Sequence, residues 1–215
     1  MAFQPVDLIN YARKEHFEHF MELNLTYSAT VSIEITDLRA ALKRKGLKAY
    51  PAQIWMLTSA ANLVPEFRMS LDDDGRLGHW DSLSPMYTVF CEAKKSFSSI
   101  WTEYRPDFES FYRACLNDIR KYNTGAFLPQ ANIPDNMLNV SSIPWVDFTA
   151  FNLNLPTKYL LPILTIGKYV ERDGKTFMPL SIQVHHAVCD GYHLGLFLEQ
   201  VNQLAANVDS WLIVR

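Results

Sequence analysis

Glycine is scarce in this sequence, and its positions exclude several common ligand-binding motifs. The 215 residues include 8 glycines. None of them falls in a G-x-G-x-x-G, G-x-x-x-x-G-K-[ST] or G-x-S-x-G pattern, the patterns that build dinucleotide turns, phosphate loops and nucleophile elbows. We therefore expect no site of these three kinds, and any cofactor must be held in another way.

Cysteine and long apolar runs are also sparse. The three cysteines, Cys91, Cys115 and Cys189, are odd in number and widely spaced, which argues against a disulfide framework. The first residues lack the charged and apolar regions of a signal peptide, and no apolar run approaches the ~18 residues of a membrane span. We expect a cytoplasmic protein with no membrane partner.

Charge of one sign is not in excess. The chain carries 20 basic and 23 acidic residues, for a net charge of −3, and no basic stripe that would indicate a nucleic-acid partner. Hydrophobic residues make up 48%, as in ordinary globular proteins. With no repeat or linker, residues 1–215 are expected to form a single domain.

Hydrophobic periodicity predicts a mixed sheet covered by helices, an α/β chain of the α+β type. Gly46 is expected to end a helix that Thr36 or Asp37 caps, Pro51 to begin the next one, and Asp173-Gly174 to form a hairpin turn. Helices are predicted over 13–23, 36–45, 51–63, 106–121 and 193–206, and strands over 26–35, 67–71, 86–92, 137–141, 149–155, 164–170 and 177–185.

The segment 183–193, QVHHAVCDGYH, is the strongest local signal for chemistry. Histidine titrates near neutral pH, so His186 is a candidate general base. Two other interpretations stay open at this point. One histidine could be a hydrogen-bonded core residue while Asp190 only caps the last helix, or His186, Cys189 and His193 could bind a metal ion.

The spacing His186-x-x-x-Asp190-Gly191, preceded by His185, resembles the active-site signature of the CoA-dependent acyltransferases. The whole chain is similar to one family among them, the classical (type A) chloramphenicol acetyltransferases. The similar segments are RKEHF at 13–17, PEFRM at 65–69, WDS at 80–82, YTVF at 87–90, PWV at 144–146, FNLN at 151–154 and 183–191. The resemblance implies the family's two-layer sandwich of sheet and helices.

The resemblance also implies roles for individual residues. His186 matches the base that deprotonates the acceptor hydroxyl, which then attacks acetyl-CoA directly. Ser141 matches the serine that stabilises the oxyanion, although by position alone Ser142 is an equal candidate. Asp190 and Arg13 match a structural ion pair of the family. No acyl-enzyme is implied, so Cys189 is interpreted as a small buried residue.

The pocket residues follow from the same resemblance. Thr165 matches a threonine near the transferred group. Three aromatic residues match the acceptor pocket, and three more match the CoA side. They are Phe20, Tyr27 and Phe97, and Tyr50, Trp145 and Tyr169. Phe20 departs from the family because some members carry tyrosine there, and 21–26 aligns with a one-residue shift. Both departures affect the acceptor pocket.

The resemblance predicts the substrates and the assembly. Chloramphenicol and acetyl-CoA are the expected partners, with acetyl-CoA as a co-substrate and neither a permanent cofactor nor a metal. A chain of this length supplies one of the two lobes that related condensation domains use, so a homotrimer with sites between subunits is expected. Two alternatives are the same chemistry on another alcohol or amine, and a non-catalytic binding trimer.

Overall fold

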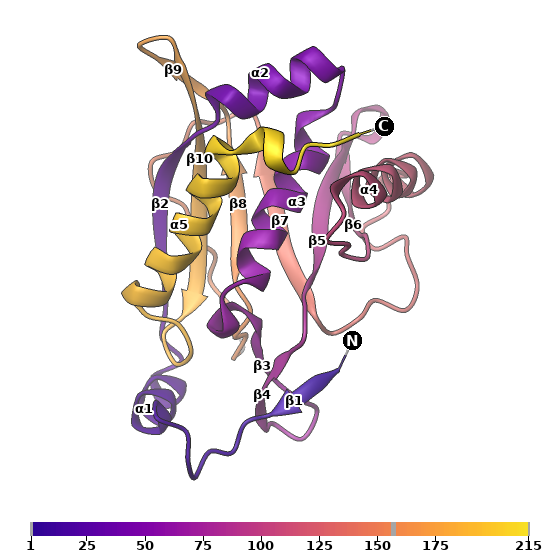
Figure 1. The fold of residues 1–215 in the computed structure, drawn as a ribbon. Helices are drawn as coiled ribbons and strands as arrows, with labels where there is room; N and C mark the ends of the chain where they lie inside the picture. The colour runs from indigo at the N-terminus through magenta and orange to yellow at the C-terminus, as the bar shows by residue number, and fades with distance from the viewer. Residues whose placement is uncertain (1, 156–157, 215) are drawn as a thin grey trace.

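The computed structural model describes residues 2–155 and 158–214. Within them, a seven-stranded mixed sheet has the order β2-β10-β8-β7-β5-β6, with β9 paired to β10, and β1, β4 and β3 form a smaller sheet (Figure 1). The large sheet consists of β2 (Thr26–Glu34), β5 (Ser84–Cys91), β6 (Ser96–Trp101), β7 (Met137–Ile143), β8 (Ile163–Gly167), β9 (Val170–Arg172) and β10 (Lys175–His185). The predicted mixed sheet with helices is confirmed.

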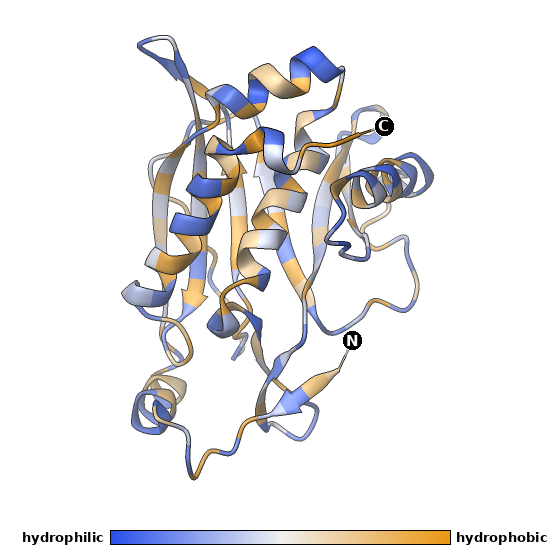
Figure 2. Cartoon of the chain, in the orientation of Figure 1, coloured by the Kyte–Doolittle hydropathy of each residue, from blue (hydrophilic) through white to orange (hydrophobic). Residues whose placement is uncertain are grey.

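Helices lie on one face of the large sheet and beyond its ends. They are α1 (Lys14–Leu23), α2 (Thr36–Lys45), α3 (Ala49–Asn62), α4 (Phe108–Tyr122) and α5 (Gly191–Ala206). In Figure 1, α3 and α5 lie across the sheet, and α1 lies beyond the end of β10 at which His185 stands. Their apolar faces turn inward, whereas α4 turns a hydrophilic face outward (Figure 2). In the described part of the chain, no helix has the length and apolar character to cross a bilayer.

The two faces of β10 have different partners. Leu180, Ile182 and Val184 belong to the main core together with Phe197 of α5. The intervening Ser181, Gln183 and His185 therefore point to the opposite face, and they are also buried. The polar face of β10 is consequently covered by something other than helices.

The segment 149–155 provides that cover, and its predicted strand is wrong. The Gln183 side chain accepts a hydrogen bond from the Leu153 N–H (2.6 Å) and donates one to the Leu153 carbonyl (2.8 Å). The Ser181 hydroxyl donates to the Phe151 carbonyl at 2.6 Å. Because side chains of the sheet satisfy the backbone of this segment, it needs no strand partner.

Three local expectations near α2 and α3 have different outcomes. Gly46 has φ 64° and ends α2 as predicted. The cap prediction is wrong, since Ile35 is the N-cap, while the Thr36 hydroxyl accepts from the Thr176 N–H at 3.0 Å. Helix α3 begins at Ala49, so Pro51 is not its first residue, but it still lies in the first turn, where its missing N–H costs nothing.

The remaining differences concern short strands and the predicted hairpin. Residues Pro65–Arg68 form a 3₁₀ turn before β3 (Met69–Leu71), and β4 (Leu77–Trp80) lies between the predicted strands 67–71 and 86–92, where no strand was expected. Strands β6 and β1 (Phe3–Pro5) were not predicted. The expected strand 164–170 is divided into β8 and β9. Asp173 and Gly174 have φ 50° and 75°, which confirms the hairpin turn.

Candidate active site

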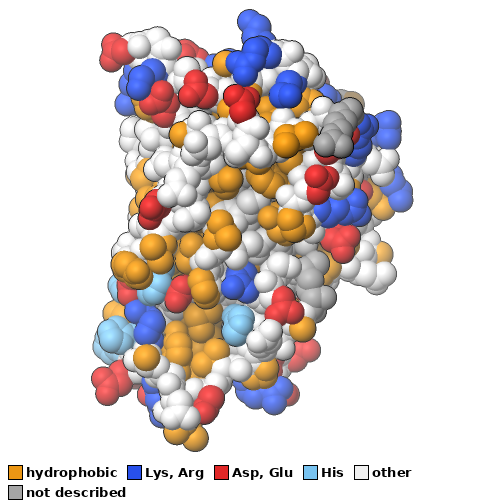
Figure 3. Space-filling model, viewed as in Figure 1, with side chains coloured by type: hydrophobic (Ala, Val, Ile, Leu, Met, Phe, Trp, Pro, Cys, Tyr) orange, Lys and Arg blue, Asp and Glu red, His pale blue; other side chains and the backbone are white. Residues whose placement is uncertain are grey.

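His186 stands directly after β10, against an aromatic wall. Its backbone N–H donates to the Leu25 carbonyl at 2.8 Å. Its imidazole stacks on Phe20 of α1, with ring centroids 4.0 Å apart and planes 15° from parallel. The Tyr27 ring lies 5.2 Å away. Three elements, β10, α1 and β2, therefore fix the position of His186, and histidine side chains gather at this end of the molecule (Figure 3).

An ion pair ties α1 to the loop after His186. Arg13 Nη1 lies 2.6 Å from Asp190 Oδ2, and about a quarter of each side chain is exposed. Asp190 also accepts from the Tyr192 N–H as the N-cap of α5. Burial raises the pKa of the Asp190 carboxyl, but the hydrogen bond from Arg13 and the charge of Arg13 outweigh it, so this pKa lies below its usual range. Asp190 thus combines the two roles considered for it, helix cap and ion-pair partner.

Cys189 and His193 point to other partners than His186. The Cys189 thiol is buried, and burial raises its pKa to about 12, which keeps it protonated and unreactive at neutral pH. His193 faces Asp190 and Glu66, at 3.0 Å and 3.5 Å. Across 2–155 and 158–214, no three His, Cys, Asp or Glu side chains are grouped to hold a metal ion.

A cavity of 880 Å³ opens elsewhere on the sheet, and Ser141 of β7 lines it. Phe97, Tyr50, Trp145 and Tyr169 line it as well. Trp145 is 62% exposed and packs edge-on against Phe90, with ring centroids 5.0 Å apart. The cavity thus brings together five residues that the sequence reasoning had singled out from four separate segments.

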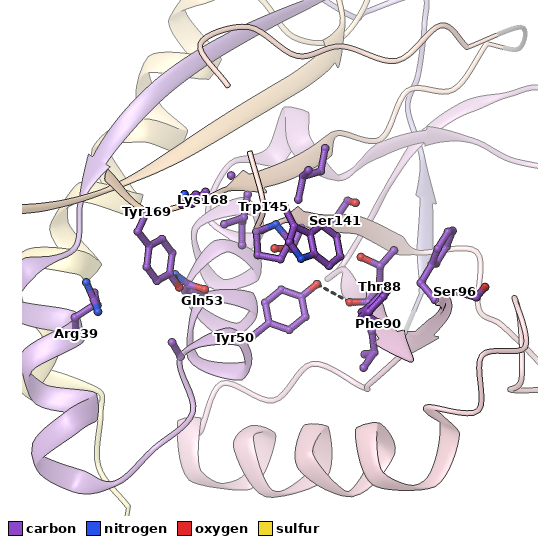
Figure 4. Close-up of a pocket in the computed structure, with 18 of the residues that line it drawn as sticks. Arg39, Tyr50, Gln53, Thr88, Phe90, Ser96, Ser141, Trp145, Lys168 and Tyr169 are labelled. Atoms are coloured by element: carbon purple, nitrogen blue, oxygen red, sulfur yellow. Dashed lines mark hydrogen bonds between the residues drawn. The ribbon is translucent and has the colours of Figure 1, made fainter. Parts of the chain in front are cut away.

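Two tyrosines on the cavity wall, both labelled in Figure 4, are held by hydrogen bonds. The Tyr50 hydroxyl donates to the Thr88 carbonyl at 3.0 Å. Tyr169 accepts from Gln53 Nε2 at 2.6 Å, and the Arg39 guanidinium lies 5.4 Å from its ring centre. Burial raises the pKa of both phenols, so both hydroxyls keep their protons at neutral pH.

Sequence reasoning missed several polar residues of this cavity. Arg39, Lys95 and Lys168 line it, where Arg39 pairs with Glu171 and Lys95 with Glu92, and Gln53 holds Tyr169. Gln53 lies in a helix that is buried over eleven consecutive residues, so its polarity alone was the available signal. A buried side-chain amide needs a hydrogen-bond partner, and the Tyr169 hydroxyl is that partner for Gln53.

Thr165 lies beside Ser141 but outside the cavity wall. The register pairs Ser141 of β7 with Thr165 of β8, and Thr165 with Ser181 of β10. Directly paired residues share a face of the sheet, so Ser141, Thr165 and Ser181 form one polar row. Thr165 is 2% exposed. It pairs with Ser141 and is buried beneath the surface, and its expected place near the transferred group stays a prediction.

The site residues fall into two groups within one chain. The first, the His186 half-site, comprises His186, Phe20, Tyr27, Arg13 and Asp190. The second, the Ser141 half-site, comprises Ser141, Phe97, Tyr50, Trp145 and Tyr169. His186 is not among the residues that line the cavity.

Strand geometry sets the distance between the half-sites. Ser141 is level with Ser181, two strands away from β10, and His186 is five residues beyond Ser181 (186 minus 181). At ~3.4 Å per residue and ~4.8 Å per strand, the two Cα atoms are about 20 Å apart. His186 contacts Tyr27, which pairs with Val184 and so faces away from the Ser181 row. One chain therefore cannot bring these two side chains to one reacting centre.

Known proteins match this chain along almost its full length. The family profile described as "Chloramphenicol acetyltransferase" matches residues 1–202. A chloramphenicol acetyltransferase from Clostridium perfringens is 49% identical over 216 residues, covering 99% of both chains. One from Bacillus pumilus is 49% identical over 214 residues, covering 98% of this chain and 96% of its own.

Solved structures agree with the sequence matches. A structure titled "chloramphenicol acetyltransferase" superposes with a TM-score of 0.87 at 27% identity, covering 95% of this chain and all of the other. A probable dihydrolipoamide acetyltransferase from Listeria monocytogenes superposes with a TM-score of 0.67 at 16% identity, which shows a shared fold. The chain is thus an acetyltransferase by its relatives, and it belongs to the chloramphenicol acetyltransferase family.

Proposed function

We propose that this enzyme, one domain over 1–215, transfers the acetyl group of acetyl-CoA to the primary hydroxyl of chloramphenicol and so confers resistance to the antibiotic. The full-length match to proteins with this name carries the proposal. His186 supports it because a histidine held rigidly against Phe20 and Tyr27 is suited to meet an apolar acceptor. Acetyl-CoA is an intracellular metabolite, so the reaction is placed in the cytoplasm.

His186 is the general base in this proposal. It removes the proton of the acceptor hydroxyl as the oxygen attacks the thioester carbonyl, within a complex that holds both substrates. The tetrahedral oxyanion accepts a hydrogen bond from the Ser141 hydroxyl. When the intermediate collapses, the C–S bond breaks, and the CoA thiolate takes the proton from the His186 imidazolium. The buried, protonated Cys189 thiol takes no part.

A second copy of the chain completes the site. The His186 half-site of one subunit faces the Ser141 half-site of its neighbour, because the two are about 20 Å apart within one chain. A contact between two different surfaces is head-to-tail, and three such contacts close into a ring. We therefore propose a homotrimer with three sites between subunits.

The Ser141 half-site receives acetyl-CoA as a co-substrate that leaves as CoA. Tyr50, Trp145 and Tyr169 supply aromatic surface along the cavity, which suits the apolar pantetheine arm and the adenine ring. Lys168 supplies positive charge for phosphates, whereas Arg39 and Lys95 already pair with Glu171 and Glu92. Phe97, on the same wall, faces the acceptor, and Thr165 supports the transferred group from the neighbouring strand.

Phe20 gives a reason to consider another acceptor. Its ring stacks directly on His186, at a position where some relatives carry a phenol that could donate a hydrogen bond. A second candidate function is therefore the same acetyl transfer to a different alcohol or amine. The chemistry would be unchanged, and only the pocket next to the base would differ.

Release of the CoA thiol tests the proposal directly. The purified protein is mixed with acetyl-CoA and chloramphenicol, alongside His186→Ala and the control His79→Ala, which alters a histidine of the small sheet. We expect rapid release by the wild type and by the control, and none by His186→Ala. No release by a folded wild type would refute chloramphenicol as acceptor, and an active His186→Ala would refute the assigned base.

A further inference from the structure

Every backbone N–H of the loop from His186 to Asp190 has an acceptor. The His186 N–H donates to the Leu25 carbonyl, and the Val188 and Cys189 N–H groups donate to the His185 carbonyl. The other two donate to imidazole nitrogens. The Ala187 N–H donates to His185 Nδ1 at 3.2 Å, and the Asp190 N–H donates to His193 Nδ1 at 3.1 Å.

An imidazole nitrogen accepts a hydrogen bond only when it carries no hydrogen. The geometry therefore assigns a neutral state to both flanking histidines, with the hydrogen on Nε2. For His193 this tautomer directs Nε2–H toward Glu66 Oε1, 3.5 Å away. For His185, burial together with the charges of His186 and Lys158 lowers the pKa, which agrees with a neutral ring.

We propose that His185 and His193 are positioning residues, whose unprotonated Nδ1 atoms fix the loop that carries His186. The inference rests on the proposed role of His186 as the base. The two rings hold opposite ends of the loop, one next to His186 and one at Asp190, where Arg13 also binds. Both rings are almost completely buried, at 1% and 6% exposure, so water does not replace them easily.

Protonation would change the His193 contacts in a defined way. His193 Nδ1 lies 3.0 Å from Asp190 Oδ1 as well as 3.1 Å from the Asp190 nitrogen. An imidazolium would donate to the carboxylate and leave the backbone N–H without an acceptor. Asp190, Glu66 and, through Asp190, Arg13 are the charged groups facing this ring, and the Tyr192 ring also lies against it.

Matched pairs of variants distinguish the loss of the hydrogen-bond acceptor from the loss of the volume of each imidazole ring. Glutamine at the third helical position supplies the acceptor for the N-cap N–H in a capping box, and methionine has a similar shape without that acceptor. His193→Gln is therefore compared with His193→Met. At the other end, His185→Asn keeps an oxygen near the Nδ1 position, and His185→Leu removes it.

The readouts are amide hydrogen exchange of Ala187 and Asp190 and the kinetics of CoA release. We expect His193→Met to lose protection at Asp190 and His185→Leu to lose it at Ala187, with kcat falling about tenfold and KM for both substrates unchanged. His193→Gln and His185→Asn should keep protection and most of kcat.

The inference would be overturned if His193→Met and His185→Leu kept the wild-type rates of amide hydrogen exchange and the wild-type kcat. Equal losses in both members of each pair would overturn it too, because the acceptor would then be irrelevant. Hydrogen exchange needs no substrate, so it tests this inference even if His186→Ala proves active and the assigned base is wrong. In that case, the protection data alone decide whether the two imidazoles hold the loop.

Discussion

Ser141 lies in the sheet and His186 directly after one of its strands, and the two cannot act together within one chain. Ser141 is level with Ser181, and the chain runs five more residues from Ser181 to His186, two strands away. The resulting separation of about 20 Å exceeds the reach of a serine and a histidine around one carbonyl. The proposed reaction therefore requires a second copy of the chain.

Ser141→Ala should slow the chemical step. Loss of one oxyanion donor lowers kcat by about 10²–10³, while KM for acetyl-CoA stays nearly constant because the donor acts mainly on the transition state. Steady-state CoA release measures both constants. Ser142→Ala is the comparison, since the next residue along β7 also lines the cavity. A larger loss in Ser142→Ala would contradict the assignment.

Cys189→Ala should remain active. The buried thiol has a pKa of about 12, so almost no thiolate is available at neutral pH, and direct attack by the acceptor needs none. We expect kcat within about threefold of the wild type. Kinetics with both substrates varied should give intersecting lines. Parallel lines, or an acetyl group found on Cys189 by mass spectrometry, would show a covalent pathway instead.

Arg13→Ala should destabilise the fold and the catalytic loop. The change leaves the half-buried Asp190 carboxylate without its cation, and a lost hydrogen bond to a charged group costs about 1–3 kcal/mol. Unfolding in urea measures the free energy of unfolding of each variant. Lys175→Ala is the control, because its partner Glu34 is exposed and such pairs contribute about 0–1 kcal/mol. Equal losses for the two variants would count against a structural role for Arg13.

The free energy of unfolding should depend on pH through His185. Burial and the charges of His186 and Lys158 hold its pKa in the folded protein below the ordinary 6.5. At a pH between the pKa of His185 in the folded protein and its ordinary pKa of 6.5, the unfolded chain binds more protons than the folded one. The contribution of His185 to stability is therefore complete above about pH 6.5 and decreases as the pH falls below it. His185→Asn should reduce this dependence in urea unfolding at pH 7.5 and 5.5. An unchanged slope would mean that other groups carry it.

Trp145→Ala should weaken the binding of acetyl-CoA. Trp145 is 62% exposed in the single chain and lies over the cavity, so its removal costs little stability. Loss of stacking should raise KM for acetyl-CoA about tenfold, with a smaller effect on the acceptor. Ile9→Ala, at the 86% exposed Ile9, is the control. A change in KM for the acceptor alone would place Trp145 on the acceptor side.

Local signals in the sequence predicted the elements that local forces determine. The alternating pattern that begins at Thr26 became β2, and Asp173-Gly174 turned the chain between β9 and β10 because both residues tolerate positive φ. The pattern at 149–155 wrongly predicted a strand, because Gln183 and Ser181 of β10 form hydrogen bonds with the backbone of this segment. Such a bond depends on tertiary structure, which alternation of apolar residues does not encode.

The site residues were predicted from the family resemblance, whereas their positions relative to one another became known only from the fold. No local pattern distinguishes Ser141 from Ser142, or reveals that Ser141 pairs with Thr165. The order of the strands places Ser141 in the cavity that Tyr50 and Trp145 also line. It places His186 against Phe20 of α1. The polar residues that the sequence reasoning missed, such as Gln53, become visible only when their partners are known.

Mixed assemblies of two inactive variants test the central claim most directly. His186→Ala and Ser141→Ala are unfolded together in equal amounts, refolded, and assayed for CoA release beside each variant refolded alone. A site between subunits combines an intact His186 from one copy with an intact Ser141 from its neighbour, so random trimers should recover about one quarter of wild-type activity. Activity no higher than that of the parents, in a mixture shown to contain mixed trimers, would contradict a site shared between two copies.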